Sequence, residues 1–545
     1  MSTLIADLPP LRAALLCAVP LLFTLAAVSS LSSTAPNGGW RWARWGAGLA
    51  LSAAIFSLAG LMVGGPGIWR GPSLGGPYAG ILFSLRSDAL ANVMLVLVCF
   101  IAWVIVGYSQ SYLGGQRGQP RYIRSLMLSL AAVTLLVLSN NLLLLVLAWI
   151  ATSLSLHALL TFFDQRPQAL IAAHKKFLAS RLADVCMLGA IAIVASQLGT
   201  LEIDSAVAAA RALPAYSATL QWAAVLFVIG ALVKCAQLPV HGWLIQVMEA
   251  PTPVSALLHA GIVNLGGFVL IRLGTLVADV ALAQALLVGV GGITAVVAAA
   301  TMMTRISIKV ALAWSTCAQM GFMLMQCGLG LYDLALLHIV AHSLYKAYAF
   351  LTAGTAVEHN RLQQMTPPLP PLGGLAWFAS AIVGVGIVAA AALVWGIRPA
   401  EAPALWAVSA VLALALVPLL AGPLLRAGRA WVFAGIAGAF AVALAYFGLH
   451  LLFKQWLGAP ALAPANMGLV FWVIGCFVVL FVVQGAVRAR PQGALSRKLY
   501  PWLFAGLYLD EVFTRLTFRV WPARLPAKPA APQPILPETP ASGAL

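Results

Sequence analysis

The sequence predicts an all-α polytopic membrane protein. Of its 545 residues, 62% are hydrophobic and only 8% are charged, and the mean hydropathy is +0.97. Soluble domains carry about 25% charged residues, so this composition excludes an ordinary soluble globule. Apolar windows of about 20 residues recur along the chain, and each is long enough to cross a bilayer as a helix. We therefore expect about fifteen transmembrane helices.

The expected crossings follow one another through short connections. In chain order they cover 12–33, 46–64, 88–112, 123–139, 141–163, 177–199, 220–245, 253–277, 280–303, 310–330, 332–355, 375–396, 403–423, 430–452 and 467–488. The first run has no basic leader and no small-residue cleavage site, so we interpret it as a retained helix.

The placement of the charges predicts a membrane orientation and argues against nucleic-acid binding, although the net charge is +17. When the connections are numbered alternately, one side receives only Arg12, Arg70, Arg86, Arg211, Arg398 and Lys454. The other side receives most of the remaining Lys and Arg. Because basic loops stay in the cytoplasm, we expect the N-terminus outside, the C-terminus in the cytoplasm and an odd number of crossings.

The stretch 231–274 contains two membrane helices that are interrupted. Lys234 lies inside an apolar run that Pro239 breaks shortly afterwards. Pro251 and Pro253 open the next run, which carries His259. A lysine in hydrocarbon costs several kcal/mol, and broken backbone at membrane depth is tolerated only inside protein or beside water. The stretch therefore predicts that an ion crosses the membrane here.

Two preceding spans carry further titratable residues. His157 lies in the fifth span and can be either a packing residue or a proton carrier. In the sixth span, Arg181 and Asp184 are three residues apart and can pair on one helix face. That pair is either a neutralised interfacial pair or the counter-charge of a nearby lysine. Lys175 and Lys176 are expected to extend out to the interface.

The eleventh span is the second strong signal. His338, His342 and Lys346 recur every four residues, which places three titratable groups on one stripe. The spacing of the two histidines also suits a metal, but no acid follows His338 and a lysine lies one turn on, so no metal site is expected. Lys309, at the start of the tenth span, can face either the interface or the interior. The seven cysteines show no CxxC pairing and are interpreted as buried packing residues.

The C-terminal third changes in character. A Pro-rich linker at 367–371 precedes spans twelve to fifteen, whose centres contain almost no charge. The tail from Leu499 is amphipathic, which fits either an interfacial helix or a partner-docking helix. After Pro522 the Pro/Ala-rich end is expected to be disordered.

At LVKCAQLPVHGWL and EAPTPVSALLHAGIV, and again at DLALLHIVAHSLYKAYAFLTAG and KKFLASRLADV, the sequence resembles the antiporter-like membrane subunits of respiratory complex I and Mrp antiporters. The resemblance implies two inverted five-helix repeats, each with a broken helix and half of a proton path. The implied segments are N-terminal helices at 1–112, repeats at 113–279 and 280–423, C-terminal helices at 424–490 and a cytoplasmic amphipathic helix and tail at 491–545. The residues that match the family's polar axis are Lys234, His259, Lys309, His338, His342 and Lys346, with Asp184 as the acid near the first lysine.

Two departures from the family's pattern indicate which members of the family the chain resembles most. Ile150 stands where the family's fifth helix carries a glutamate, and no lysine occurs at 375–396, where complex I subunits carry an exit lysine. The chain also leaves no room for the long lateral helix of the complex I end subunit. We expect His157 or Asp184 to replace the missing glutamate as the partner of Lys234. With the tail GLYLDEVFTRLTFRVWPARLP, these departures resemble the DabB family, the membrane subunits of a bacterial inorganic-carbon accumulation system.

The DabB resemblance implies a function for the chain. It implies a proton- or Na+-conducting subunit in the bacterial inner membrane that is not itself an enzyme and carries no cofactor. The implied partner is a cytoplasmic, zinc-containing, carbonic-anhydrase-like subunit, DabA, which ion flow energises to hydrate CO2 to bicarbonate. The alternatives are a complex I-like or Mrp-type translocating subunit, and a non-conducting anchor for a soluble enzyme.

Overall fold

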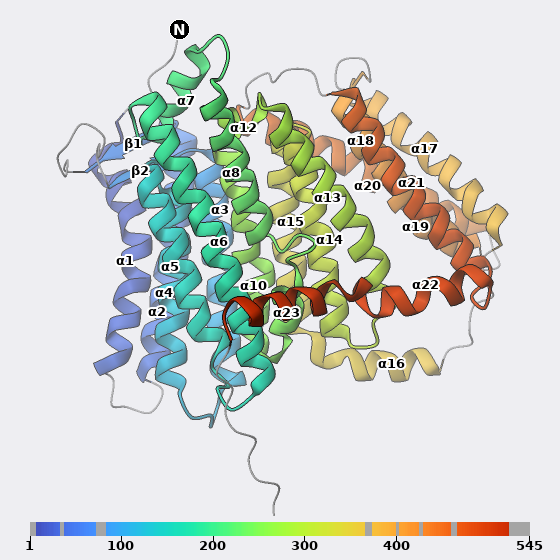
Figure 1. Cartoon of the computed structure of the whole chain (residues 1–545), viewed down its shortest axis with the longest axis horizontal. Coiled ribbons are helices and arrows are strands. Elements are labelled where there is room, and N and C mark those ends of the chain that lie inside the picture. Colours follow the sequence, from blue (N-terminus) through green and yellow to red (C-terminus); the bar gives the residue numbers. More distant parts are fainter. Residues whose placement is uncertain are drawn as a thin grey trace, which may run out of the picture.

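The fold is a bundle of membrane-spanning helices with almost no sheet (Figure 1). The computed structural model describes residues 7–32, 38–71, 83–365, 373–398, 403–424, 429–458 and 466–522. Within these residues, fourteen helices are long and apolar enough to cross a membrane. A fifteenth crossing is shorter and interrupted, as described below. The chain is thus a multi-pass membrane protein, and the predicted fold class is confirmed.

The N-terminal helices form one side of the bundle. They are α1 (Pro10–Ser32), α2 (Gly38–Gly64) and α3 (Ala89–Tyr112). Between α2 and α3, the strands β1 (Gly67–Arg70) and β2 (Ser84–Ser87) pair in antiparallel fashion, with Gly67 opposite Ser87. Asp88 begins α3 as its N-cap by accepting a hydrogen bond from the backbone N–H of Ala91. The same carboxylate pairs with Arg86 at 2.7 Å and also with Arg272 at 2.5 Å.

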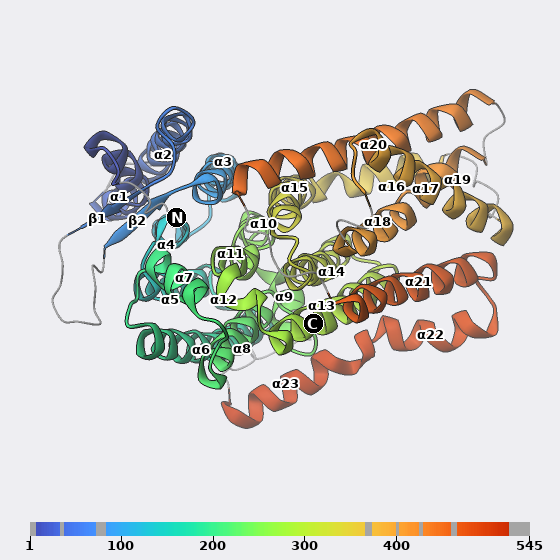
Figure 2. The same ribbon diagram turned by 90° about the horizontal axis from the view of Figure 1, so that it is seen from above.

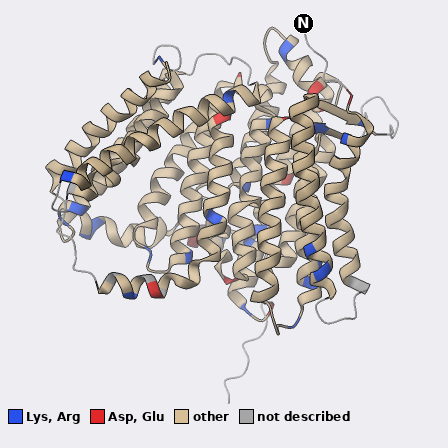
Figure 3. Ribbon diagram, turned by 180° about the vertical axis from the view of Figure 1, so that it is seen from behind, with Lys and Arg blue, Asp and Glu red and all other residues tan. Residues whose placement is uncertain are grey.

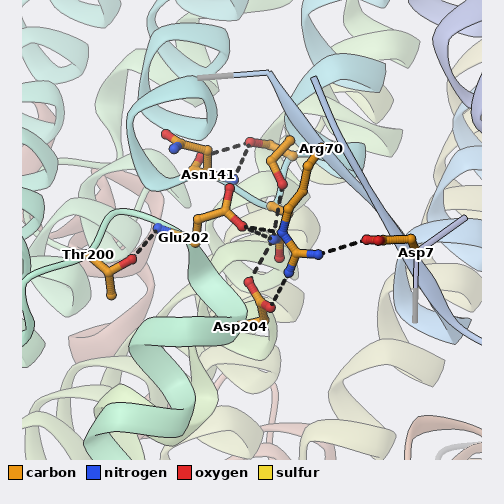
Figure 4. Close-up of polar contacts among 9 residues, drawn as sticks. Asp7, Arg70, Asn141, Thr200, Glu202 and Asp204 are labelled. Carbon is orange, nitrogen blue, oxygen red and sulfur yellow. Dashed lines mark hydrogen bonds and ion pairs between the residues drawn. The ribbon is translucent and has the colours of Figure 1, made fainter. Parts of the chain in front are cut away.

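A cluster of ion pairs closes this end of the bundle around Arg70 (Figure 4). The guanidinium of Arg70 lies 3.0 Å from Asp7, 3.4 Å from Glu202 and 3.1 Å from Asp204. The side chain of Asn140 donates a hydrogen bond of 2.8 Å to Asp204. Charges held this way stabilise more than isolated surface pairs because several share one network. The cluster ties β1 to the start of the short helix α7 (Ile203–Ala212).

The middle of the chain contains the predicted break. Its elements are α4 (Gln119–Leu138), α5 (Leu142–Leu160), α6 (Pro167–Leu198), α8 (Ala218–Lys234), α9 (Gly242–Gln246), η1 (Val247–Glu249), α10 (Thr252–Ala260), η2 (Ile262–Asn264), α11 (Leu265–Arg272) and α12 (Gly274–Ala278). The seventh crossing stops at Lys234 and resumes as α9, with Pro239 in the interruption. Pro251 is the N-cap of α10, and Pro253 lies in its first turn, where proline is tolerated. Pro239 thus lies in an interruption, and Pro251 and Pro253 lie where the next helix begins.

In the second half of the bundle, glycine residues allow two helices to pack closely. It comprises α13 (Ala281–Met302), α14 (Ile308–Gly328), α15 (Tyr332–Leu351), η3 (Ala353–Thr355), α16 (Ala356–Gln364), α17 (Gly374–Val394), α18 (Pro403–Ala415), α19 (Val417–Leu424), α20 (Arg429–Leu457) and α21 (Met467–Ala489). A Cβ on Gly291 of α13 would lie 2.6 Å from the carbonyl oxygen of Gly321 of α14. Backbones that approach this closely exclude any side chain at the contact.

The resemblance implies one broken helix in the second repeat, without saying which helix it is. The fourth helix of that repeat, α17, is continuous from Gly374 to Val394. A break occurs in the next crossing instead, between Ala415 of α18 and Val417 of α19. The repeat boundaries themselves stay a prediction, and the linker at 367–371 lies outside the described residues.

The C-terminal segment runs laterally across the bundle (Figures 1 and 2). It consists of α22 (Ala494–Phe504), η5 (Gly506–Tyr508) and α23 (Leu509–Val520), which we call the arm. This arm reaches back from α21 to α6, where Asp510 pairs with Lys175. The arm lies toward the end of the bundle opposite α7, β1 and β2 (Figure 1). In Figure 3, Lys and Arg are more frequent in that half of the molecule, and some lie at mid-height between helices. The tail beyond Pro522 lies outside the described residues.

Candidate functional site

The first cluster of buried titratable residues surrounds Lys234, the last residue of α8. Its amine lies 4.4 Å from the ring centroid of Trp149 on α5, a cation–π contact, and Lys234 is 4% exposed. Asp184 of α6 is close enough to interact electrostatically with this amine. Asp184 also pairs with Arg181 at 2.6 Å, as the sequence predicted. Asp184 is thus shared between Arg181 and Lys234.

A second lysine of this cluster, Lys176, was placed wrongly by the sequence. Lys175 and Lys176 do not extend to the interface, because both are fully buried, at 0% and 2% exposure. The amine of Lys176 donates hydrogen bonds to the Ser153 carbonyl at 2.5 Å and the Ser153 hydroxyl at 2.9 Å. The reason is that α6 begins at Pro167, so Lys176 lies about 13 Å along the helix at 1.5 Å per residue.

His157 lies beside Lys176 in this cluster. Its ring packs against Phe177 at 5.5 Å between centroids, and it interacts electrostatically with Lys176. Lys176 in turn interacts with Lys234 and Asp184. The structure therefore places Lys176 between His157 and Lys234. Of the two residues expected to partner Lys234, Asp184 has the electrostatic contact with it.

The second cluster lies on α15 and α10. The amine of Lys346 donates hydrogen bonds to the Leu312 carbonyl at 3.0 Å and to the Ser315 hydroxyl at 2.8 Å, both on α14. His259 of α10 is 0% exposed, stacks on Phe350 at 4.4 Å between centroids and interacts electrostatically with Lys346. His259, in the helix that begins after the break, thus lies close to Lys346 of α15.

The two histidines of α15 extend this cluster along the helix. The Nε2 atom of His342 lies 3.3 Å from the His259 carbonyl, and the His338 and His342 rings are 5.9 Å apart between centroids. The Nδ1 atom of His338 lies 3.1 Å from the side-chain oxygen of Gln326 on α14. Gln326 was not singled out from the sequence, since a lone glutamine in an apolar span carries no pattern.

Lys309 lies at the start of α14 and faces the break. Its amine donates a hydrogen bond of 2.9 Å to the hydroxyl of Thr252, which stands between Pro251 and Pro253. Of the two orientations left open by the sequence, the structure therefore has the one that contacts the protein interior. Lys309 thus links the start of α10, where Pro251 and Pro253 lie, to α14, which also carries Ser315.

Buried polar atoms without a hydrogen-bond partner among the described residues occur along the segment 234–264, which runs from the first cluster to the second. They include Lys234 Nζ, Gln237 Oε1, Ser255 Oγ, both ring nitrogens of His259, and Asn264 Oδ1. Buried polar atoms are nearly always hydrogen-bonded, and ordered water supplies the partner where protein does not. This segment thus has the chemistry of a hydrated connection between Lys234 and His259.

The clusters do not form a metal centre among the residues described. No group of three or more His, Cys, Asp or Glu side chains lies together there in a way that could hold a metal ion. The seven cysteines are free. Lysine amines close to His259 and His342 would also repel a cation.

Comparison with known proteins places the chain in a family. Residues 139–400 match the family model described as "NADH:quinone oxidoreductase/Mrp antiporter, TM", and residues 78–123 match the one described as "NADH-Ubiquinone oxidoreductase (complex I), chain 5 N-terminus". In the Mrp complex of Dietzia sp. DQ12-45-1b, a chain 25% identical superposes with a TM-score of 0.66. This alignment covers 93% of our chain but 59% of the Mrp chain.

Two curated relatives are more similar in sequence. The protein named "Probable inorganic carbon transporter subunit DabB" of Hydrogenovibrio crunogenus is 43% identical over 84% of this chain and 86% of its own length. The DabB2 protein of Halothiobacillus neapolitanus is 37% identical over 96% of this chain and 97% of its own length. The chain therefore belongs to the DabB family of membrane subunits, within the complex I and Mrp antiporter-like proteins.

Proposed function

We propose that the chain conducts protons as the membrane subunit of an inorganic-carbon accumulation complex. The observation that carries this proposal is the pair of buried clusters around Lys234 and Lys346, which the interrupted segment with α10 and its His259 connects. Lysine and imidazole exchange protons near neutral pH when burial and neighbouring charges adjust them. Two titratable clusters on either side of a hydrated segment can pass a proton from one to the other.

The proposed partner is a soluble, zinc-containing, carbonic-anhydrase-like subunit. Support comes from the relatives named as inorganic carbon transporter subunits, which align with most of the length of this chain. In this proposal the partner carries the catalytic zinc and the membrane subunit supplies proton flow that makes CO2 hydration one-way. The complex resides in the bacterial inner membrane with the basic, arm-bearing end of the bundle in the cytoplasm, because basic ends stay there.

The test is growth of a carbonic-anhydrase-deficient bacterium in air. The chain and its partner are expected to rescue growth, whereas Lys234→Met and Lys346→Met are expected to abolish rescue while the complex still assembles. The matched control is Lys498→Met on α22, whose side chain is exposed, and it should rescue like the wild type. Rescue by both cluster variants would refute conduction. Replacing Na+ with K+ in the medium should not alter rescue, and a strict Na+ requirement would reassign the cargo to Na+.

A second function, a non-conducting anchor for the partner, is favoured by one observation. The half-buried Ile150 stands next to Trp149, where an acid would complete the site of Lys234. An anchor would retain rescue in the two cluster variants and lose it only when the partner no longer co-purifies. The same growth experiment, read with co-purification, therefore separates the two functions.

A further inference from the structure

A buried pair of ionisable side chains joins α15 to α20 outside the clusters described above. His450 of α20 contacts the carboxylate of Asp333 at the start of α15. The two side chains are 5% and 8% exposed, respectively. A buried charge pair costs desolvation free energy that its mutual attraction does not always recover, so it is seldom kept for stability alone. Inside a membrane, ionisable residues of this kind mark ion and proton pathways.

The pair lies beside the second cluster. A groove of about 520 Å³ runs between α14, α15 and α20. Its polar lining consists of Ser315, Gln319, Gln326, His338, His342, Tyr345 and Tyr446. Asp333 precedes the groove residue Leu334 on α15, and His450 follows the groove residue Leu449 on α20. One side of the pair thus borders the space that His338 and His342 line.

Tyr446 connects the groove to the pair. It lies four residues before His450, one helical turn away on the same face of α20. It interacts electrostatically with Asp333. Its hydroxyl is buried and has no hydrogen-bond partner among the described residues. A phenol hydroxyl can accept one proton while donating another, so Tyr446 is suited to relay between the groove and Asp333.

A larger cavity is lined by residues that lie close to the pair in sequence. This cavity, of about 750 Å³, lies at the α7 end of the bundle, and its lining includes Arg86, Asp88, Arg211, Arg272, Tyr332 and Gln455. Tyr332 is the neighbour of Asp333 in sequence, and Gln455 lies on the last turns of the helix that carries His450. The helices α15 and α20, which carry Asp333 and His450, thus contribute lining residues to both this cavity and the groove. The segment 375–396, which contains no lysine, is not required to supply a charged side chain at this end of the path.

We infer that Asp333 and His450 form the terminal proton relay of the second cluster, connecting His338 through Tyr446 to the cavity at the α7 end. The inference rests on the proposed proton conduction. In each passage the pair takes up one proton from the groove side and releases one to the cavity, so its charge is restored. For flow in the opposite direction the same two residues receive the proton from the cavity.

The test uses the purified complex in proteoliposomes with a pH-sensitive dye inside. Asp333→Asn and His450→Gln are expected to reduce proton flux by about tenfold or more, as removal of a proton-transfer group does. Exchanging the two residues, with Asp333→His and His450→Asp together, keeps the pair and is expected to recover part of the flux. The control is Lys454→Gln, one turn further along α20 and exposed, which should conduct like the wild type.

The outcomes separate this inference from the proposed function. Lys346→Met removes the centre of the second cluster and should abolish flux in the same vesicles. If Lys346→Met abolishes flux while both Asp333→Asn and His450→Gln conduct like the wild type, the terminal relay is refuted and conduction stands. If Lys346→Met also conducts normally, the proposed function itself fails. A drop in thermal stability of the pair variants with normal flux per folded complex would assign the pair a structural role and overturn the inference.

Discussion

Asp510 of the arm accepts a hydrogen bond of 2.5 Å from the amine of Lys175, a residue 335 positions earlier in the chain. Lys175 is completely buried, whereas the Asp510 side chain is 24% exposed. The second carboxylate oxygen of Asp510 accepts from Gln246, in the last turn of α9. One arm residue therefore contacts both α6, next to the cluster lysine Lys176, and the helix that follows the break.

The first prediction concerns this contact. Asp510→Asn leaves the buried amine of Lys175 without its counter-charge. Removing one partner of a buried ion pair costs about 3 kcal/mol or more, and the partial exposure of Asp510 places the expected loss nearer 2 kcal/mol. Unfolding of the purified chain by detergent titration should show this loss. The control is Arg515→Gln on the exposed face of α23, and equal stability of the two variants would contradict the role of Asp510.

The second prediction concerns the contact between α13 and α14. Gly291→Ala places a methyl group 2.6 Å from the Gly321 carbonyl oxygen, so the helices must separate. Gly289→Ala on the same helix meets no atom within 4 Å. Overpacking of this kind costs about 1 to 3 kcal/mol. We expect Gly291→Ala to lower the thermal midpoint of unfolding and Gly289→Ala to leave it unchanged, and similar midpoints for both would contradict the close packing.

The third prediction concerns Lys176. If Lys176 carries a proton between His157 and Lys234, Lys176→Met should reduce proton flux by about tenfold or more, with the complex still assembled. Ser153→Ala removes one of two hydrogen bonds to this amine and keeps the carbonyl, so a smaller loss is expected. Flux in vesicles and size-exclusion profiles measure both. Normal flux in Lys176→Met would show that the Lys176 side chain has only a packing role.

The fourth prediction is a pH dependence at the Arg70 cluster. Burial raises the pKa of Glu202 above its ordinary value, even though its hydrogen bonds and Arg70 act in the opposite direction. An acid with a higher pKa in the folded chain binds its proton more tightly when folded. Stability contributed by the group is therefore lost as pH rises from its unfolded pKa through its raised folded pKa.

Glu202→Gln removes this titration and tests its sign. The stability of the wild type minus that of Glu202→Gln should fall as pH rises above about 4.5 and level off once pH exceeds the raised pKa. Thermal midpoints measured across that range check it. A difference that grows more favourable to the wild type as pH rises would mean that Arg70 outweighs burial.

Sequence reasoning predicted the features that depend on local chemistry. Proline ends a helix or stands in its first turn, so an interruption near Pro239 and a helix start at Pro251 and Pro253 were predictable. The stripe His338, His342 and Lys346 follows from helical periodicity alone. In the structure His342 and Lys346 are buried, and His338 contacts Gln326.

The errors and omissions depend on packing between distant segments. The sixth span was expected to begin at 177, whereas α6 begins at Pro167, and this shift of the helix start moved Lys176 from the interface to the interior. His450 and Asp333 are 117 positions apart and meet only because α20 packs on α15. The periodicity and residue spacing of a single sequence do not predict such a long-range contact.

The most direct test of the central claim is proton flux through the purified complex in sealed vesicles under an imposed membrane potential. The clusters around Lys234 and Lys346 act in series, so either Lys234→Met or Lys346→Met is expected to reduce flux to the level of empty vesicles. Lys498→Met should keep the wild-type flux. Wild-type flux in either cluster variant, with the complex intact, would contradict conduction through these buried lysines.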